Sequence, residues 1–192
     1  MTVDYYFDPA CPWTWYTATW LTTVAEELDF EIHGHPMSLW EINNHEVPDE
    51  YREPVLLSLQ ALRLVQALDN QGRYNELWAF YRELGTRIHN EGRKWSIKVI
   101  EESALAAGIE DLDPIQDETL DAPIAEITAL AMVRGGQDIG SPLLVLPDVE
   151  KGFHGPVVDS EPMTTDEALA LWEAVAAIVK VPSFFEIKHG RG

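Results

Sequence analysis

The sequence contains very little cysteine and few basic residues. Among its 192 residues there is a single cysteine, Cys11, so no disulfide can form within the chain. Lysine and arginine number 13 against 33 aspartates and glutamates, which gives a formal net charge of −20. Nucleic acids and anionic membranes bind basic patches, and a charge of this sign does not favour either. We therefore expect no nucleic-acid partner and no membrane partner.

Long apolar runs are also missing. No stretch approaches the roughly 20 apolar residues that cross a bilayer, and the chain does not begin with a basic segment followed by an apolar run. We therefore expect a cytoplasmic protein, where the reducing environment favours a small thiol as its partner. With 46% hydrophobic residues, the chain can form one sizeable core, with room for an inserted subdomain.

The hydrophobic pattern predicts strands and helices in mixed order. We expect strands at 3–7, 30–39, 143–146 and 152–158, and helices at 12–28, 53–69, 74–89, 96–107, 122–134 and 165–180. Pro36 and Pro156 lack a backbone donor, which favours edge positions for their strands. Thr164 and Glu167 form a capping-box pattern before the last helix. The run of helices predicts a helical subdomain, 41–137, inserted into an α/β unit made of 1–40 and 138–192.

Cys11 stands where the first strand turns into the first helix, in the stretch Asp8-Pro9-Ala10-Cys11-Pro12-Trp13-Thr14. Pro12 suits the first helical position, where its missing N–H has no intrahelical partner. The free donors and positive dipole at a helix N-terminus favour thiolate, so we expect a lowered pKa and a nucleophilic sulfur. The alternative interpretation is a cysteine that only fills an apolar corner.

Other polar and aromatic residues support weaker hypotheses. His33 and His35 share one face of a strand and can begin a metal site, but no cysteine or carboxylate cluster completes it and His45 lies in a loop, so we expect no metal. Trp20 either stacks against a substrate or fills the core. Asn43 and His89 either hydrogen-bond a polar thiol or are ordinary loop and helix-end residues.

The motif Cys11-Pro12-Trp13-Thr14 resembles the active-site turn of thioredoxin-fold proteins, in particular the DsbA-like branch with Cys-Pro-Trp-Cys. Thr14 stands in place of the second cysteine. Three more stretches resemble one family within that branch: 37–39 with Asn43, 140–143, and 182–188. Together they resemble the mycothiol-dependent nitroreductases of actinobacterial DsbA-like proteins, over essentially the whole chain.

This resemblance implies a thioredoxin-like α/β fold with an inserted α-helical subdomain. It also implies that Pro142 is a cis proline facing Cys11, and that the backbone of Ser141 binds the ligand. Mycothiol, or another low-molecular-weight thiol, is the implied cofactor, and electron-poor small molecules or disulfides are the implied substrates. Because Thr14 replaces the second cysteine, a mixed disulfide on Cys11 requires an external thiol to resolve it, and Thr14 can donate a hydrogen bond to the thiolate.

Two other function classes remain open on the sequence. A kappa-type glutathione-transferase-like enzyme shares the fold and helical insert but activates the thiol of the cofactor, so Cys11 is dispensable there. A binding module without turnover uses the same groove only for recognition. The sequence also leaves open whether the chain is a monomer or a homodimer.

Overall fold

The protein has a mixed α/β fold, seen in a computed structural model that describes residues 1–188 and 190. Its strands are β1 (Thr2–Phe7), β2 (Glu31–Pro36), β3 (Leu143–Val145) and β4 (Phe153–His154). Its α-helices are α1 (Pro12–Leu28), α2 (Leu39–Ile42), α3 (Asp49–Asn70), α4 (Tyr74–Gly85), α5 (Ile97–Ala106), α6 (Asp121–Gly135) and α7 (Thr165–Ile178). A π-helical turn, η1 (Thr86–Asn90), continues α4, and two 3₁₀ turns, η2 (Asp113–Gln116) and η3 (Glu118–Leu120), precede α6.

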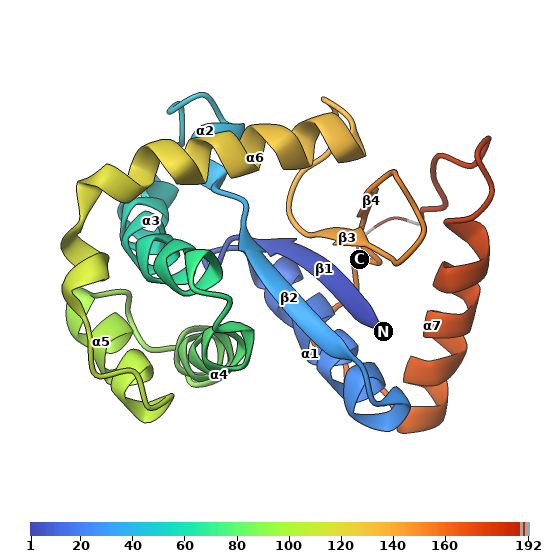
Figure 1. The fold of residues 1–192 in the computed structure, drawn as a ribbon, viewed down its shortest axis with the longest axis horizontal. Coiled ribbons are helices and arrows are strands. Elements are labelled where there is room, and N and C mark those ends of the chain that lie inside the picture. The colour runs from blue at the N-terminus through green and yellow to red at the C-terminus, as the bar shows by residue number, and fades with distance from the viewer. Residues whose placement is uncertain (189, 191–192) are drawn as a thin grey trace.

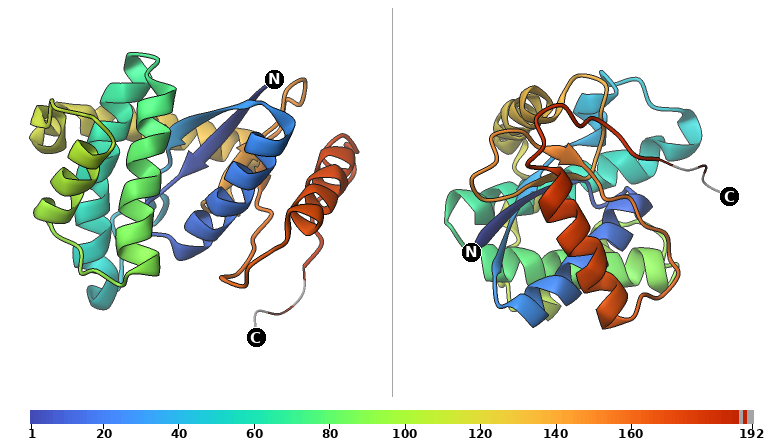
Figure 2. Two further views of the ribbon diagram at one scale, coloured as in Figure 1. Left: turned by 90° about the horizontal axis from the view of Figure 1, so that it is seen from below. Right: turned by 90° about the vertical axis from the view of Figure 1, so that its right-hand side faces the viewer.

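The four strands form one sheet in the order β2-β1-β3-β4, with β2 parallel to β1 and the other pairs antiparallel. The expected edge position of the second strand is therefore confirmed. Side chains alternate along β1: Tyr5 bonds to α1, whereas the neighbouring Tyr6 accepts a hydrogen bond from Arg134 of α6. In Figures 1 and 2, α1 and α6 accordingly lie on opposite faces of the sheet.

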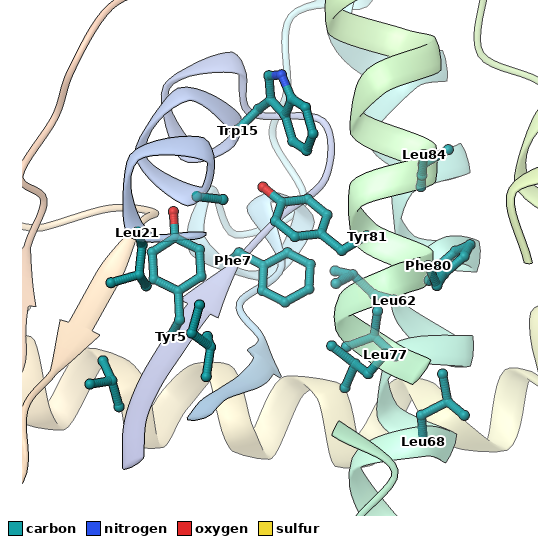
Figure 3. Close-up of a cluster of buried hydrophobic side chains, with 14 of the residues drawn as sticks. Tyr5, Phe7, Trp15, Leu21, Leu62, Leu68, Leu77, Phe80, Tyr81 and Leu84 are labelled. Carbon is teal, nitrogen blue, oxygen red and sulfur yellow. The ribbon is translucent and has the colours of Figure 1, made fainter. Parts of the chain in front are cut away.

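The helices surround the sheet unevenly. α7 packs beside α1, while α3, α4 and α5 gather beyond the β2 edge (Figure 1). α4 approaches β2 so closely at Gly34 that a Cβ there would lie 2.6 Å from a methyl carbon of Leu77, which explains the glycine in mid-strand. Phe7 and Tyr81 bring the buried aromatic groups of sheet and helix together (Figure 3).

The second half of α6 covers the other face of the sheet. A small core there consists of Tyr6, Met37, Ala131, Leu143 and Val145. Within the described part of the chain, no helix is both long and apolar enough to cross a membrane.

The mixed order of strands and helices confirms the expected fold class, and the capping box of Thr164 and Glu167 is present. Several boundaries differ. α3 begins at Asp49, four residues before the expected start. The second strand ends at Pro36, three residues before its expected end, and the short helix α2, which was not expected, begins at Leu39. The fourth strand is only two residues long, because Gly155 adopts φ 98° and Pro156 lacks an N–H, so the chain leaves the ladder.

Candidate active site at the start of α1

Cys11 is the N-cap residue of α1. Its backbone is extended, with φ −82° and ψ 114°, and Pro12 occupies the first helical turn as expected. The turn before the helix closes through a hydrogen bond from the Cys11 N–H to the Asp8 carbonyl, 3.1 Å long. The sulfur therefore lies at the helix N-terminus. Only 9% of the residue is exposed, however.

The loop before β3 covers the sulfur. The Ser141–Pro142 peptide is cis, as the family resemblance implied. The Cys11 thiol lies 3.9 Å from the Ser141 carbonyl oxygen and can donate to it. Two segments 130 residues apart in the sequence thus meet at this sulfur.

The hydroxyls of Thr14 and Ser141 form a pair 2.9 Å apart beside the cysteine. The Asp8 N–H donates to the Ser141 hydroxyl oxygen at 3.1 Å. Since each hydroxyl carries one proton, Ser141 can donate in turn to Thr14, which leaves the Thr14 proton free to point at the sulfur. Below this pair, the Tyr5 hydroxyl donates to the Thr14 carbonyl at 2.7 Å, which fixes the first turn of α1.

The expected lowering of the Cys11 pKa is wrong for this structure. Burial of the thiol raises its pKa, and this effect outweighs the hydrogen bonds from the Thr14 hydroxyl and the Thr14 and Trp13 N–H groups, which lower it. The nearby Asp8 carboxylate also raises the pKa. The sequence revealed the helix N-terminus but not the covering of the sulfur by the Ser141 loop.

Asp8 is fully buried behind the active-site turn, and sequence reasoning missed its role. Its carboxylate accepts hydrogen bonds from the Ala10 N–H at 2.8 Å, from the Leu39 N–H at 2.7 Å and from the Ser58 hydroxyl. Burial raises the pKa of Asp8, although these donors oppose that effect. Asp8 therefore joins the turn before Cys11 to α2 and α3. A serine on the apolar face of a helix, as at Ser58, was the available sequence signal.

His89 lies against the same turn. Its Nε2 atom donates to the Pro9 carbonyl at 2.8 Å, and its ring lies nearly parallel to that of Trp15, with centroids 6.2 Å apart. Burial lowers the pKa of His89, so the neutral imidazole is favoured. His89 thus supports the loop that carries Cys11.

Trp13, on the exposed side of the motif, is half-buried and lies edge-on to Tyr16 at 6.3 Å. Trp20, in contrast, is 4% exposed, donates to the Ala168 carbonyl and contacts Trp172, so it packs between α1 and α7. The geometry of Trp20 corresponds to the core alternative.

Of the predicted site residues, the structure groups Cys11, Thr14, Ser141, Pro142 and His89 in one place, with Pro12 and Trp13 in the same turn.

Asn43, in contrast, ends α2, and its side-chain amide donates to the Leu39 carbonyl at 2.7 Å. The polar group of Asn43 is thus engaged within its own short helix.

The two strand histidines are held by other partners. His35 lies between Asp4 and Asp69, with each ring nitrogen 3.0 Å from a carboxylate oxygen, and His33 stacks on Tyr74. Among the described residues, no group of three or more histidine, cysteine, aspartate or glutamate side chains is arranged to hold a metal ion.

A cavity of about 420 Å³ is lined by Thr2, Asp4, Arg134 and residues 145–150. It lies at the end of β1 opposite to Cys11, so the cysteine site and this cavity are separate.

A family model described as Rv2466c-like, mycothiol-dependent nitroreductase Rv2466c, matches residues 10–189. The uncharacterized protein Rv2286c of Mycobacterium tuberculosis (strain ATCC 25618 / H37Rv) is 28% identical to the chain over 194 residues, which cover 98% of this chain and 81% of that protein.

Two solved structures share the fold. The cytosolic disulfide reductase DsbM from Pseudomonas aeruginosa with GSH has a TM-score of 0.60 and 16% identity, over 92% of this chain and 100% of its own. A 2-hydroxychromene-2-carboxylate isomerase has a TM-score of 0.53 and 16% identity, over 93% of this chain and 96% of its own. These likenesses show the DsbA-like thioredoxin fold and nothing about the reaction.

Proposed function

The chain belongs to the Rv2466c-like family of mycothiol-dependent nitroreductases, and on this premise we propose that Cys11 is its only redox-active group and that mycothiol is its external thiol. Members of such a family are thiol-dependent oxidoreductases, and a small thiol is the partner of this enzyme. We assign small electrophiles, including nitro compounds, or disulfides as its substrates, and the cytoplasm as its location.

One observation carries the proposal. The chain's single sulfur lies at the start of α1, between the Ser141 carbonyl of the cis-proline loop and the Thr14 hydroxyl, at the place where thioredoxin-fold proteins carry their reactive cysteine. A lone cysteine has no partner sulfur within the chain. A small thiol supplies the second sulfur, and this fits the chemistry of a thiol cofactor.

The proposed chemistry needs three exchange steps on a disulfide substrate. The Cys11 thiolate attacks one sulfur, the substrate S–S bond breaks, and the departing thiolate takes up a proton. A small thiolate then attacks the Cys11 sulfur, and the second half of the substrate leaves as a thiolate that also takes up a proton. A second small thiolate attacks the small-thiol sulfur now bound to Cys11, and the Cys11 sulfur leaves with the bonding electron pair. The substrate disulfide is thereby reduced by two electrons to two thiols, and two small thiols are oxidised to one disulfide. For a nitro compound, two thiols supply two electrons and two protons in each reductive step.

Thr14 has a defined part in this chemistry. Its hydroxyl stabilises the Cys11 thiolate, while Ser141 accepts from the Asp8 N–H and orients the Thr14 proton. The buried thiol is protonated at neutral pH, so the sulfur loses its proton only as a substrate or thiol reaches it. Thr14 then holds the negative charge at the sulfur.

Mass spectrometry with oxidised mycothiol tests the assignment. We expect the wild-type protein to gain the mass of one bound thiol and Cys11→Ala to gain none. With a nitro compound and reduced mycothiol, Cys11→Ala should lose thiol consumption. If Cys11→Ala adopts the fold and keeps the full rate of consumption, Cys11 is not the redox group.

The Thr14→Val variant tests whether the Thr14 hydroxyl stabilises the Cys11 thiolate. A hydrogen bond to a charged group contributes about 1.5–3 kcal/mol, so we expect alkylation of Cys11 by iodoacetamide at pH 7 to slow about tenfold or more. Thr23→Val, further along α1, is the matched control because the Thr23 hydroxyl donates to the Thr19 carbonyl of its own helix and has no other hydrogen bond among the described residues. Equal rates for both variants would exclude this role of Thr14.

A kappa-type transferase mechanism is the second candidate, and the raised pKa of Cys11 favours it. In that mechanism the Thr14 hydroxyl holds the thiolate of the cofactor, and Cys11 is not used. The two candidates differ in one result: Thr14→Val lowers turnover in both, whereas Cys11→Ala abolishes turnover only in the oxidoreductase.

We also propose that residues 41–137 form a helical insert within a thioredoxin-like unit of 1–40 and 138–192. The support is that all four strands fall in the outer ranges, whereas α3 to α6 fall in the inner one and α2 crosses the boundary between them. In limited proteolysis, we expect the chain to be cleaved near residues 41 and 137 before it is cleaved at other sites. Early cleavage within β1 or β3 would contradict the proposed insert.

A further inference from the structure

Tyr81 on α4 is a buried polar residue that the proposed chemistry does not use. The residue is fully buried, and its hydroxyl has no hydrogen-bond partner among the described residues. An unsatisfied buried donor costs about 1–3 kcal/mol, and phenylalanine would avoid this cost in the same space. The hydroxyl is therefore not explained by packing.

The ring of Tyr81 is held firmly. It stacks on Phe7 with centroids 4.0 Å apart and lies edge-on to Trp15 at 5.7 Å and to Trp78 at 5.6 Å. With aromatic rings on three sides, the ring has no room to turn the hydroxyl toward solvent. The direction of this hydroxyl is consequently a fixed property of the fold.

The hydroxyl is directed toward the first turns of α1 (Figure 3). The other phenol in this region, Tyr5, uses its hydroxyl to bind the Thr14 carbonyl, so the two tyrosines approach the start of the helix together. Burial raises the pKa of Tyr81, and negative charge on Cys11 and on Asp8 raises it further, which places both groups within electrostatic reach of the hydroxyl.

Of these two charged neighbours, Asp8 is already supplied with donors. Its oxygens accept hydrogen bonds from the Ala10 and Leu39 N–H groups and from the Ser58 hydroxyl. The Cys11 thiolate is stabilised by the Thr14 hydroxyl and by two backbone N–H groups. These donors do not compensate for burial, and the pKa of Cys11 stays raised. The charge that most needs a further donor is therefore that of Cys11.

We propose that Tyr81 is a positioning residue of the active site, whose buried O–H dipole stabilises the negative charge that develops on Cys11 when the thiol loses its proton. The proposal rests on the assignment of Cys11 as the nucleophile. The cost of the unsatisfied hydroxyl is present while the sulfur is neutral and is offset when the sulfur becomes charged. The helix α4 thereby takes part in the chemistry as well as in the core.

Tyr81→Phe tests the proposal, because it removes the hydroxyl and keeps the ring. The measurement is the rate of Cys11 alkylation by iodoacetamide from pH 6 to pH 10, on the folded full-length protein. We expect the profile of the variant to move upward by about half a pH unit or more, which is a threefold or larger loss of rate below the inflection. Tyr74→Phe is the matched control, since Tyr74 stacks on His33 and is expected to leave the profile unchanged.

The other ionisable groups around the sulfur are the same in both variants. They are Asp8 in the turn, Tyr5 on β1 and His89 on η1, so a shift confined to Tyr81→Phe is assigned to the missing hydroxyl. Urea unfolding of each variant shows whether the fold is kept, and removal of an unsatisfied hydroxyl should not lower the stability.

Two results overturn the proposal in distinguishable ways. If the wild-type profile shows an inflection and Tyr81→Phe has the same profile, Tyr81 is a structural residue and the assignment of Cys11 is unaffected. If Cys11 in the wild-type protein is alkylated only after denaturation, the nucleophile itself is wrong and the role of Tyr81 fails with it.

Discussion

The position of His35 between two carboxylates predicts that the stability of the protein depends strongly on pH. The imidazole lies between Asp4 and Asp69 with only 16% of its side chain exposed, and each ring nitrogen is 3.0 Å from a carboxylate oxygen. Burial lowers the pKa of His35, but the hydrogen bonds and charges of the two carboxylates outweigh it and raise the pKa from 6.5 to about 9. His35 is thus charged in the folded protein at neutral pH.

The size and sign of the effect follow from linkage. A raised pKa means that the folded state holds the proton more tightly, so the stabilisation is fully present below pH 6.5 and is lost as the pH rises through about 9. Each pKa unit corresponds to about 1.4 kcal/mol. Between pH 7 and pH 10 we therefore expect His35 to lose about 2–3 kcal/mol of its contribution to the free energy of unfolding.

The contribution of His35 can be isolated by urea unfolding of the wild-type protein and of His35→Gln. Both proteins are measured at pH 7, 8, 9 and 10 under reducing conditions. Tyr6 and Tyr74 lie next to His35, but they are present in both proteins and cancel in the difference. We expect the stability difference between the two proteins to shrink by about 2–3 kcal/mol from pH 7 to pH 10. A difference that stays constant over this range would refute the charged state of His35.

Two further predictions concern packing and helix capping. Gly85→Ala should destabilise the protein by about 1–3 kcal/mol in urea unfolding, because a Cβ there would lie 2.1 Å from the buried ring of Trp15, whereas Gly140→Ala, with open space around it, should change little. If both variants are equally stable, the conclusion that Gly85 packs too closely against Trp15 to accept a Cβ is wrong. Thr164→Ala removes the N-cap of α7 and should cost about 0.5–2 kcal/mol in the same assay, and an unchanged stability would show that the cap does not hold α7.

Local sequence patterns predicted most helices and the sheet edge. Apolar residues at helical spacing placed α1, α4 and α7 close to their observed ranges, and Pro36 correctly indicated an edge strand. The short helix α2 was not foreseen, because a hydrogen bond to a distant segment holds its first residue. The strand at 152–158 was foreseen but is shorter than predicted, because the backbone turns away at Gly155 and Pro156. The Leu39 N–H at the start of α2 donates to Asp8, which no local pattern contains.

The candidate site was predictable only in part. The motif and the family resemblance identified Cys11 and Pro142, because these residues are visible in the sequence itself. The burial of Cys11, and with it the raised pKa, depends on the loop that folds back over the sulfur from 130 residues away. Tyr81 lies within the helix predicted at 74–89, yet its unpartnered hydroxyl is a property of the assembled core.

The distance in sequence between Cys11 and Ser141 has a consequence for synthesis on the ribosome. The nascent chain exposes Cys11 early, but β3, which pairs with the middle of β1, and the loop that covers the sulfur emerge only after residue 140. Until then the sulfur lacks the covering that raises its pKa, and a growing chain of this protein offers cellular oxidants and electrophiles a more accessible thiol than the finished one does.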